Sequence, residues 1–264
     1  MLRITVLTLF PEYFDSFIHN SIIARAVFKG VVSFDFVNIR DFTKDKHHRV
    51  DDRPVGGGAG LIMKMQPLDD ALSSVHDENS HVVMLSPLGR TYNQQKAIEF
   101  SKLSHLILIC GHYEGIDARF NKKVDEMISI GDYITTGGEV GALAIADSVT
   151  RLLDGAITAD STKEESFNEP LLEYPQYTLP YDYKGEKIPD ILFSGNHLAI
   201  EKWRRREAIR STMEKRPDLY KEFVPDKEDR KRIREIEDNE ISKTEKMALE
   251  KGKRFIEAEK KKSS

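Results

Sequence analysis

Three glycine-containing turns hold the residues of this chain that are best suited to bind a small ligand. They cover residues 85–89 (LSPLG), 111–115 (GHYEG) and 130–138 (IGDYITTGG), and each begins where a short apolar run ends. Ten of the sixteen glycines fall within residues 56–60 and 111–141, so backbone freedom is concentrated there. Turns that follow the strands of an α/β sheet are a common place for ligands. We therefore expect the three turns to converge on one pocket.

The chemistry of such a pocket would come mainly from backbone groups. Glycine turns expose N–H and C=O groups, and the cationic side chains near these turns are Arg90 and Arg119. A triphosphate would require more positive charge, of the kind that lysines supply. The wall is better suited to the edge of an adenine ring and to an amino-acid group.

A further glycine-rich stretch, residues 51–60 (DDRPVGGGAG), resembles a phosphate loop only in part. Four glycines in five residues predict a loop rather than a helix or a strand. The Gly-Lys-Ser/Thr ending of a phosphate loop is missing, because Leu61 follows Gly60. A nucleotide hydrolase built on this loop is therefore a minor alternative.

Other residues with possible chemistry have simpler interpretations. His47 and His48 lie in a polar stretch without a supporting cluster, which favours a solvated loop over a metal site. Cys110 is the only cysteine and ends an apolar run, so we expect a buried thiol. A single cysteine also excludes an internal disulfide and a cysteine-rich zinc site.

A basic stretch lies near the C-terminal end. Residues 202–216 contain seven lysines and arginines, although the whole chain has a net charge of −4. The arginines of a helix there could contact nucleic-acid phosphates, or the helix could simply be charged and solvated. Residues 226–264 contain 24 charged residues in 39, with a thin apolar stripe that is typical of a solvated helix.

The elements that must position these residues alternate between strands and helices. Short continuous runs of apolar residues predict strands, and apolar residues that recur every three or four positions predict helices. We expect strands at 3–10, 31–39, 81–85, 106–110 and 127–130, helices at 11–30, 63–75, 93–103 and 140–153, and an amphipathic stretch at 119–126. This order indicates an α/β fold with a mostly parallel sheet. Residues 156–189 show no period, and from residue 196 the chain is expected to be helical.

The sequence also indicates where in the cell the protein is expected. No stretch reaches the length of a membrane helix, and the N-terminus lacks the apolar core and cleavage site of a signal peptide. We therefore expect a cytoplasmic protein with no membrane partner.

Six long motifs occur in a fixed order: DDRPVGGGAG, LSPLGR, CGHYEGID, IGDYITTGGE, SFNEPLLEYPQYT and SGNHLAIEKWR. In order and spacing they resemble the bacterial tRNA (guanine-N1)-methyltransferases of the TrmD family, from the first strand to about Leu219. The resemblance implies transfer of a methyl group from S-adenosyl-methionine to N1 of the guanine at tRNA position 37.

The same resemblance implies an architecture. The family has a SPOUT-type α/β domain whose C-terminal part forms a trefoil knot, and it works as a homodimer with the active site at the subunit interface. We expect a SPOUT domain at 1–157, an interdomain catalytic loop at 158–175 and a smaller, mainly helical tRNA-binding domain with a charged tail at 176–264.

The resemblance assigns the cofactor to the three turns, largely through backbone groups. The implied S-adenosyl-methionine residues are Leu85, Ser86, Pro87, Gly89, Gly111, Tyr113, Glu114, Gly115, Ile130, Gly131, Asp132, Tyr133, Ile134, Thr135, Gly137 and Gly138. Dependence on Mg²⁺ is implied by the family alone, and no ligand cluster in the sequence identifies a metal site.

Two charged residues are implied in catalysis. N1 of guanine carries a proton at neutral pH, so a base must remove it while negative charge develops on O6. The family's base is an aspartate directly before a Ser-Phe pair, and here Glu165 precedes Ser166 and Phe167. Glu164 is the adjacent alternative. Arg151 matches the family arginine that is proposed to stabilise charge near O6.

The implied tRNA contacts lie toward the C-terminal end. They are Glu173, Trp203, Arg204, Arg205, Arg206 and Arg210. A target base that is turned out of its stack could rest on Tyr113 or Tyr133. The chain departs from the family pattern at Leu88, usually Gln, at His112, usually Arg, and at residues 140–141, where a proline commonly stands. Because glutamate replaces the usual aspartate base, a non-catalytic RNA-binding protein is the second hypothesis.

Overall fold

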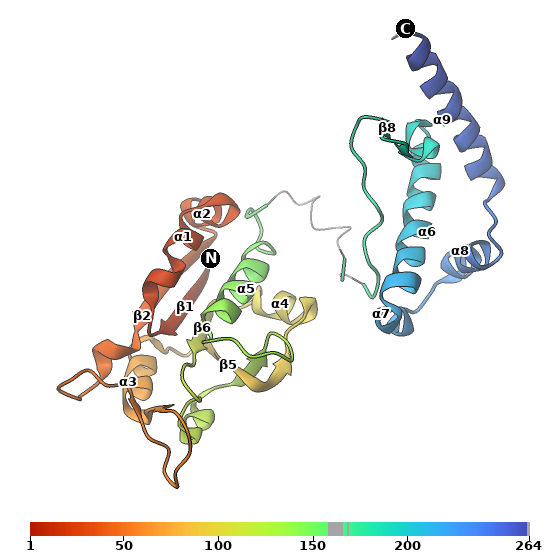
Figure 1. The fold of residues 1–264 in the computed structure, drawn as a ribbon. Helices are drawn as coiled ribbons and strands as arrows, with labels where there is room; N and C mark the ends of the chain where they lie inside the picture. Colours follow the sequence, from red (N-terminus) through yellow and green to blue (C-terminus); the bar gives the residue numbers. More distant parts are fainter. Residues whose placement is uncertain (158–165, 168, 263–264) are drawn as a thin grey trace. The chain divides into compact units, whose positions relative to one another are not determined.

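The computed structural model describes residues 1–157, 166–167 and 169–262 (Figure 1). The chain forms two compact units, Met1–Thr162 and Lys163–Ser264. Each unit has its own apolar core. In the described part of the chain, no helix is both long enough and apolar enough to cross a bilayer.

The first unit is built on a five-stranded parallel sheet with the strand order β2-β1-β6-β5-β7. The strands are β1 (Leu2–Thr8), β2 (Val32–Asn38), β5 (Ser80–Thr91), β6 (His105–Cys110) and β7 (Glu126–Ser129). Every residue of the central strand β6 is buried, which matches its continuous apolar run. The expected α/β fold with a mostly parallel sheet is confirmed.

Helices cover both faces of this sheet, because successive strand residues point to opposite sides. On one face, Leu106 and Leu108 pack with α2 (Ser21–Phe28), α4 (Gln94–Phe100) and α5 (Glu139–Thr150). On the other face, Ile107 and Ile109 pack with α3 (Met65–Val75), η2 (Ile39–Phe42) and η3 (Ala118–Lys123). The layers thus leave the carboxyl ends of the strands accessible from one edge.

Local structure differs from the expectation at two places. The single helix expected at 11–30 is divided into η1 (Pro11–Phe14), α1 (Asp15–Ile18) and α2, because Asn20 is extended and Ser21 has φ of +57°. The strand expected to end at Leu85 continues as β5 through Thr91. It does so by shifting its register on β7 between Leu85 and Arg90, which accommodates Pro87 within the strand.

Two further differences are smaller. The amphipathic stretch 119–126 becomes η3 followed by β7, and the glycine-rich loop is the tip of a short hairpin between β3 (Asp51–Asp52) and β4 (Ile62–Met63). An isolated bridge between Met63 of β4 and Ile116 joins this hairpin to the segment before η3.

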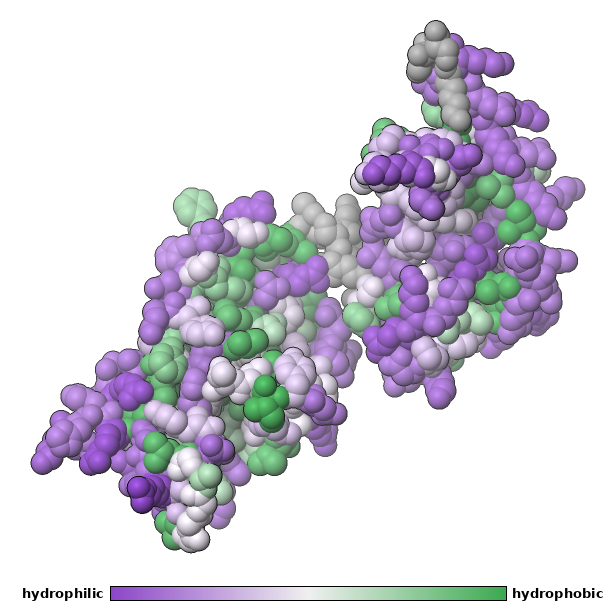
Figure 2. All heavy atoms as spheres, viewed as in Figure 1, coloured by the Kyte–Doolittle hydropathy of each residue, from purple (hydrophilic) through white to green (hydrophobic). Residues whose placement is uncertain are grey.

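The second unit is mainly helical. It contains α6 (His197–Lys215), α7 (Pro217–Glu222), α8 (Lys227–Glu237) and α9 (Lys243–Lys262), with η5 (Asp190–Phe193) and a small hairpin of β8 (Asp182–Tyr183) and β9 (Glu186–Lys187). Gly252 lets α9 approach η5, since a Cβ there would overlap the carbonyl of Asp190. The visible surface of these helices is largely hydrophilic, as their charge predicts (Figure 2).

A buried histidine closes the amino-terminal edge of the sheet. The His105 Nε2 atom lies 2.9 Å from Oγ1 of Thr5, and its Nδ1 atom lies 2.8 Å from the guanidinium of Arg3 and 2.7 Å from Oγ of Ser80. Arg3 also forms an ion pair with Asp77. Burial and the charge of Arg3 together lower the pKa of His105, although Asp77 opposes them.

Lowering the pH from 7 to 5.5 is expected to reduce the free energy of unfolding, in part through His105. Its pKa is lower in the folded chain than in the unfolded chain, where it is about 6.5. The unfolded chain therefore binds the proton first, and the stabilisation present above that pH is lost below it. Urea unfolding at both pH values would measure this. His105→Asn should show a smaller loss, and an equal loss in both proteins would contradict the prediction.

Candidate functional site

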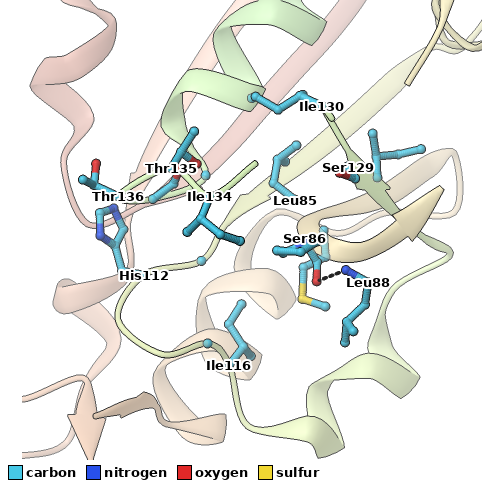
Figure 3. Close-up of a pocket in the computed structure, with 18 of the residues that line it drawn as sticks. Leu85, Ser86, Leu88, His112, Ile116, Ser129, Ile130, Ile134, Thr135 and Thr136 are labelled. Carbon is cyan, nitrogen blue, oxygen red and sulfur yellow. Dashed lines mark hydrogen bonds between the residues drawn. The ribbon is translucent and has the colours of Figure 1, made fainter. Parts of the chain in front are cut away.

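The three turns surround one cavity of about 610 Å³ in the first unit (Figure 3). Of the sixteen residues expected to bind the cofactor, fourteen line it. They are Leu85, Ser86, Pro87, Gly111, Tyr113, Glu114, Gly115, Ile130, Gly131, Tyr133, Ile134, Thr135, Gly137 and Gly138. The turns meet because β6, β5 and β7 are adjacent parallel strands, so their carboxyl ends lie at one edge.

Two of the expected residues do not line the cavity. They are Gly89 and Asp132. Gly89 packs against β7 instead, where a Cβ would overlap the backbone of Met127 and Ile128. A glycine is therefore needed at position 89 so that β5 can pack closely against β7. The structure adds other lining residues that the turn pattern missed, among them Met84, Leu88, His112, Ile116, Asn121 and Thr136.

The second and third turns are joined directly through their backbones. The Gly138 N–H donates to the Gly111 carbonyl at 2.9 Å, and Gly137 forms an isolated bridge with His112. A Cβ at Gly138 would lie 2.6 Å from Cα of Cys110. The glycine pair is therefore required by the close approach of two backbone segments, and this approach forms one wall of the cavity.

The glycine-rich hairpin meets the cavity at Glu114. The Glu114 N–H donates to the Leu61 carbonyl at 3.0 Å, and the Met63 N–H donates to the Gly115 carbonyl at 2.9 Å. A Cβ at Gly60 would overlap the side chain of Glu114. The hairpin thus packs on the second turn, and its last glycine makes room for a cavity residue.

A buried carboxylate lies behind the cavity wall. Glu139, in the first turn of α5, contacts Nε2 of His112 at 2.7 Å and Oγ1 of Thr8 at 2.6 Å. Neighbouring Cys110 is buried, as expected, and burial together with the charge of Glu139 raises the pKa of its thiol. That thiol therefore stays protonated at neutral pH and is a poor nucleophile.

The residues expected to act on the substrate lie in both units. Arg151 directly follows α5 in the first unit and is partly buried. Glu165, like Glu164, lies outside the described residues. The positions after it belong to the second unit, where the Glu173 N–H donates to Oγ of Ser166 at 2.8 Å.

The segment that follows Glu165 is attached to the helices of the second unit. The Arg216 guanidinium lies 5.8 Å from the ring centroid of Phe167, and Arg205 forms an ion pair with Glu169. Leu171 is buried against Ile209 of α6. Side chains of α6 and of the α6–α7 junction therefore hold the chain on the carboxyl side of the expected base.

Helix α6 does not turn all its basic residues outward. Trp203 and Arg206 are both only 6% exposed, and Arg206 pairs with buried Glu245 at 3.0 Å. Arg205 pairs with Asp229 at 2.8 Å. Trp203 and Arg206 thus recur on one buried face of α6 together with Ala199 and Ile209, and the tRNA contacts expected of this stretch stay a prediction. Exposed Arg204 stacks on Tyr174, and partly exposed Arg210 lies 3.5 Å from Glu207.

No group of three or more metal-ligating side chains occurs among the described residues. His47 and His48 lie in a turn that follows η2, with the His47 N–H donating to Asp45 at 2.8 Å.

Comparison with known proteins identifies the relatives of this chain. The family model described as "tRNA (Guanine-1)-methyltransferase TrmD" matches residues 2–222. A tRNA (guanine-N(1)-)-methyltransferase from Dictyoglomus turgidum is 50% identical over 237 residues, which are 89% of this chain and 97% of the relative. One from Malacoplasma penetrans is 50% identical over 223 residues, which are 84% and 99%. One from Clostridium botulinum is 49% identical over 232 residues, which are 87% and 97%.

The family match covers the sheet, the three turns that surround the cavity, and helix α6 of the second unit. Together with relatives at about half identity over most of both chains, it shows that this chain belongs to the TrmD family of tRNA (guanine-N1)-methyltransferases.

Proposed function

We propose that this protein transfers a methyl group from S-adenosyl-methionine to N1 of guanosine 37 in tRNA. Membership of the family supports a methyltransferase that acts on tRNA guanine. The observation that carries the proposal is the cavity, whose wall consists of three glycine turns at adjacent strand ends.

The described residues fit the proposed cofactor. The cavity is about 610 Å³, within the size range of small-molecule sites. Its wall offers the backbone groups of residues 111–115 and 130–138, and Leu85 and Ile130 offer apolar contact. Bound S-adenosyl-methionine would supply a sulfonium methyl group that is already activated for displacement.

The residues of the chain must then align the acceptor and remove its proton. Glu165 is proposed to take the proton from N1 of guanine, which exposes the lone pair that attacks. Arg151 is proposed to stabilise the negative charge that develops on O6. The remaining requirement is alignment of the two reactants, and the rigid turns of the cavity wall suit that purpose.

The family resemblance further supports a homodimer that works in the cytoplasm. Arg151 and the cavity belong to the first unit, whereas the segment after Glu165 belongs to the second. We propose that the loop of one subunit serves the cavity of its partner, and that the first unit carries the family's trefoil knot.

Methyl transfer from labelled S-adenosyl-methionine into a tRNA transcript tests the proposal. Mapping the product should place 1-methylguanosine at position 37. Binding of cofactor and tRNA without transfer would instead favour the non-catalytic RNA-binding hypothesis. Binding and hydrolysis of ATP would favour the hydrolase built on residues 51–60, although that loop lacks the lysine such sites use.

Arg204→Glu is expected to weaken tRNA binding and to spare cofactor binding. Arg204 is exposed, and its guanidinium lies 4.7 Å from the ring centroid of Tyr174, so the charge is held in place at the surface. Loss of one phosphate contact should lower the slope of log affinity against log salt by about 1. Filter binding at several salt concentrations would measure this.

Arg25→Glu, on the exposed face of α2 in the first unit, is the matched control for charge reversal. If both variants weakened tRNA binding equally, general repulsion would explain the result, and Arg204 would not be a specific contact. Arg206 is unsuitable for this test because it is buried in the core of the second unit.

A further inference from the structure

A chain of hydrogen bonds links three distant segments behind the cavity wall. Thr8 ends β1, His112 lies in the second turn, and Glu139 begins α5. The Thr8 and Glu139 side chains are almost completely buried, and the side chain of His112 is 15% exposed. None of these residues has a part in the proposed proton removal at guanine.

The direction of each hydrogen bond follows from its neighbours. The Phe10 N–H donates to Oγ1 of Thr8 at 3.0 Å, so the single proton of Thr8 is directed to Oε1 of Glu139 at 2.6 Å. A carboxylate can only accept, so Oε2 of Glu139 receives its bond from Nε2 of His112 at 2.7 Å. The network therefore places a proton on Nε2 of His112.

This arrangement leaves the other ring nitrogen as an acceptor. In the neutral imidazole, a proton on Nε2 leaves a lone pair on Nδ1. The described residues supply no hydrogen-bond partner for Nδ1, and His112 lines the cavity beside Thr135 and Thr136 (Figure 3). Nδ1 therefore keeps an open lone pair at the cavity wall, which can accept a hydrogen bond from a ligand group that donates.

The ring is also confined in position. A Cβ at Gly137 would overlap Nε2 of His112, and the Phe10 ring packs edge-on at a centroid distance of 5.0 Å. The backbone N–H of His112 contacts Sδ of Met63 at 3.2 Å. The imidazole thus has little freedom to rotate, and its Nε2 atom stays directed at Glu139.

We propose that His112, held by Glu139 and Thr8, is a positioning residue that accepts a hydrogen bond through Nδ1 from an N–H or O–H group of the bound methyl donor. The inference rests on the proposed function. The ligand class is a molecule with amino or hydroxyl donors, such as a nucleoside joined to an amino acid. Glu139 and Thr8 act through His112 and do not touch the ligand.

Glu139→Gln tests the network because it preserves shape and changes only the hydrogen-bond pattern. The proton of Thr8 still points to position 139, so the glutamine oxygen faces Thr8 and its NH₂ group faces His112. Nε2 of His112 must then accept, and the ring proton moves to Nδ1, where it can no longer accept from the ligand. Affinity for S-adenosyl-methionine should fall about tenfold, while kcat at saturating donor should change less.

The double variant Thr8→Val/Glu139→Gln separates this role from a merely structural one. Without the Thr8 hydroxyl, the glutamine can turn its oxygen toward His112 and restore the Nε2–H form. Donor affinity should therefore recover relative to Glu139→Gln, even though a second native hydrogen bond has been removed. A structural role alone predicts a further loss.

Nitrogen NMR of ¹⁵N-histidine-labelled protein reads the tautomer directly, without any assay of turnover. We expect the Nε2–H form in the wild type and the Nδ1–H form in Glu139→Gln. Titration of each protein with S-adenosyl-methionine by calorimetry gives the affinities. Wild-type protein that does not bind this donor would refute the proposed function. Wild-type binding with unchanged affinity in Glu139→Gln, or an unchanged tautomer, would overturn the inference alone.

Discussion

Glu165→Ala is expected to lower the turnover number for methyl transfer by roughly 10²- to 10⁴-fold, the usual contribution of a general base. Without the carboxylate, N1 of guanine keeps its proton, and its lone pair is not available for attack. Donor affinity should change little, because every described residue that lines the cavity belongs to the first unit. Single-turnover kinetics with saturating tRNA would measure the rate of the chemical step, and calorimetry would measure donor binding.

Glu164→Ala is the matched control, since it removes the same charge one residue earlier. Glu165 directly precedes Ser166, which accepts a hydrogen bond from the Glu173 N–H at 2.8 Å, and Phe167 lies beneath Arg216. The described residues directly after position 165 are therefore held by side chains and backbone of the second unit. If Glu164→Ala lost activity and Glu165→Ala kept it, the assignment of the base would be wrong. Glu165→Asp should retain activity, because aspartate carries the same charge and is the base that the family resemblance implies.

Gly138→Ala is expected to abolish detectable donor binding and to reduce the free energy of unfolding by about 1–3 kcal/mol, as for other overpacked sites. The added Cβ would lie 2.6 Å from Cα of Cys110 and 3.1 Å from N of Gly111. Both are backbone atoms at the end of β6, so no side chain can move aside. The two turns must separate, which breaks the hydrogen bond from Gly138 to Gly111 and opens the cavity wall.

Urea unfolding and a donor titration would test this prediction together. Gly195→Ala is a useful control, because Gly195 lies in the second unit with φ of +63° and no atom within 4 Å of the added Cβ. It should cost up to about 1 kcal/mol through backbone strain and leave donor binding intact. Unchanged donor affinity in Gly138→Ala would show that the close approach of the two turns is not needed for the site.

Much of the first unit could be predicted from local patterns. The apolar run of β6 and the period of α5 depend on neighbouring residues, and a strand end followed by glycine is visible without any long-range contact. The position of the cavity followed from these features, since parallel strands end at a common edge. The family motifs added the reaction and the expected base, neither of which periodicity could reveal.

Errors arose where a tertiary contact overrode a local preference. Pro87 and Gly89 are ordinary signals for the end of a strand, yet β5 continues because β7 pairs with Arg90 and Thr91 after a register shift. Arg206 belongs to a basic run that suggests a solvated face, yet its charge is buried against Glu245 of α9. In both cases the decisive partner lies more than thirty residues away.

The sequence by itself therefore determined the α/β order, the three turns and the family, because each of these depends on neighbouring residues or on long motifs. Only the tertiary structure decided which turn residues line the cavity and which arginines of α6 stay at the surface. It alone brought Thr8 to Glu139, 131 positions along the chain, and Glu139 to His112. Hydrogen bonds between such distant residues depend on sheet order and helix packing, which no local spacing encodes.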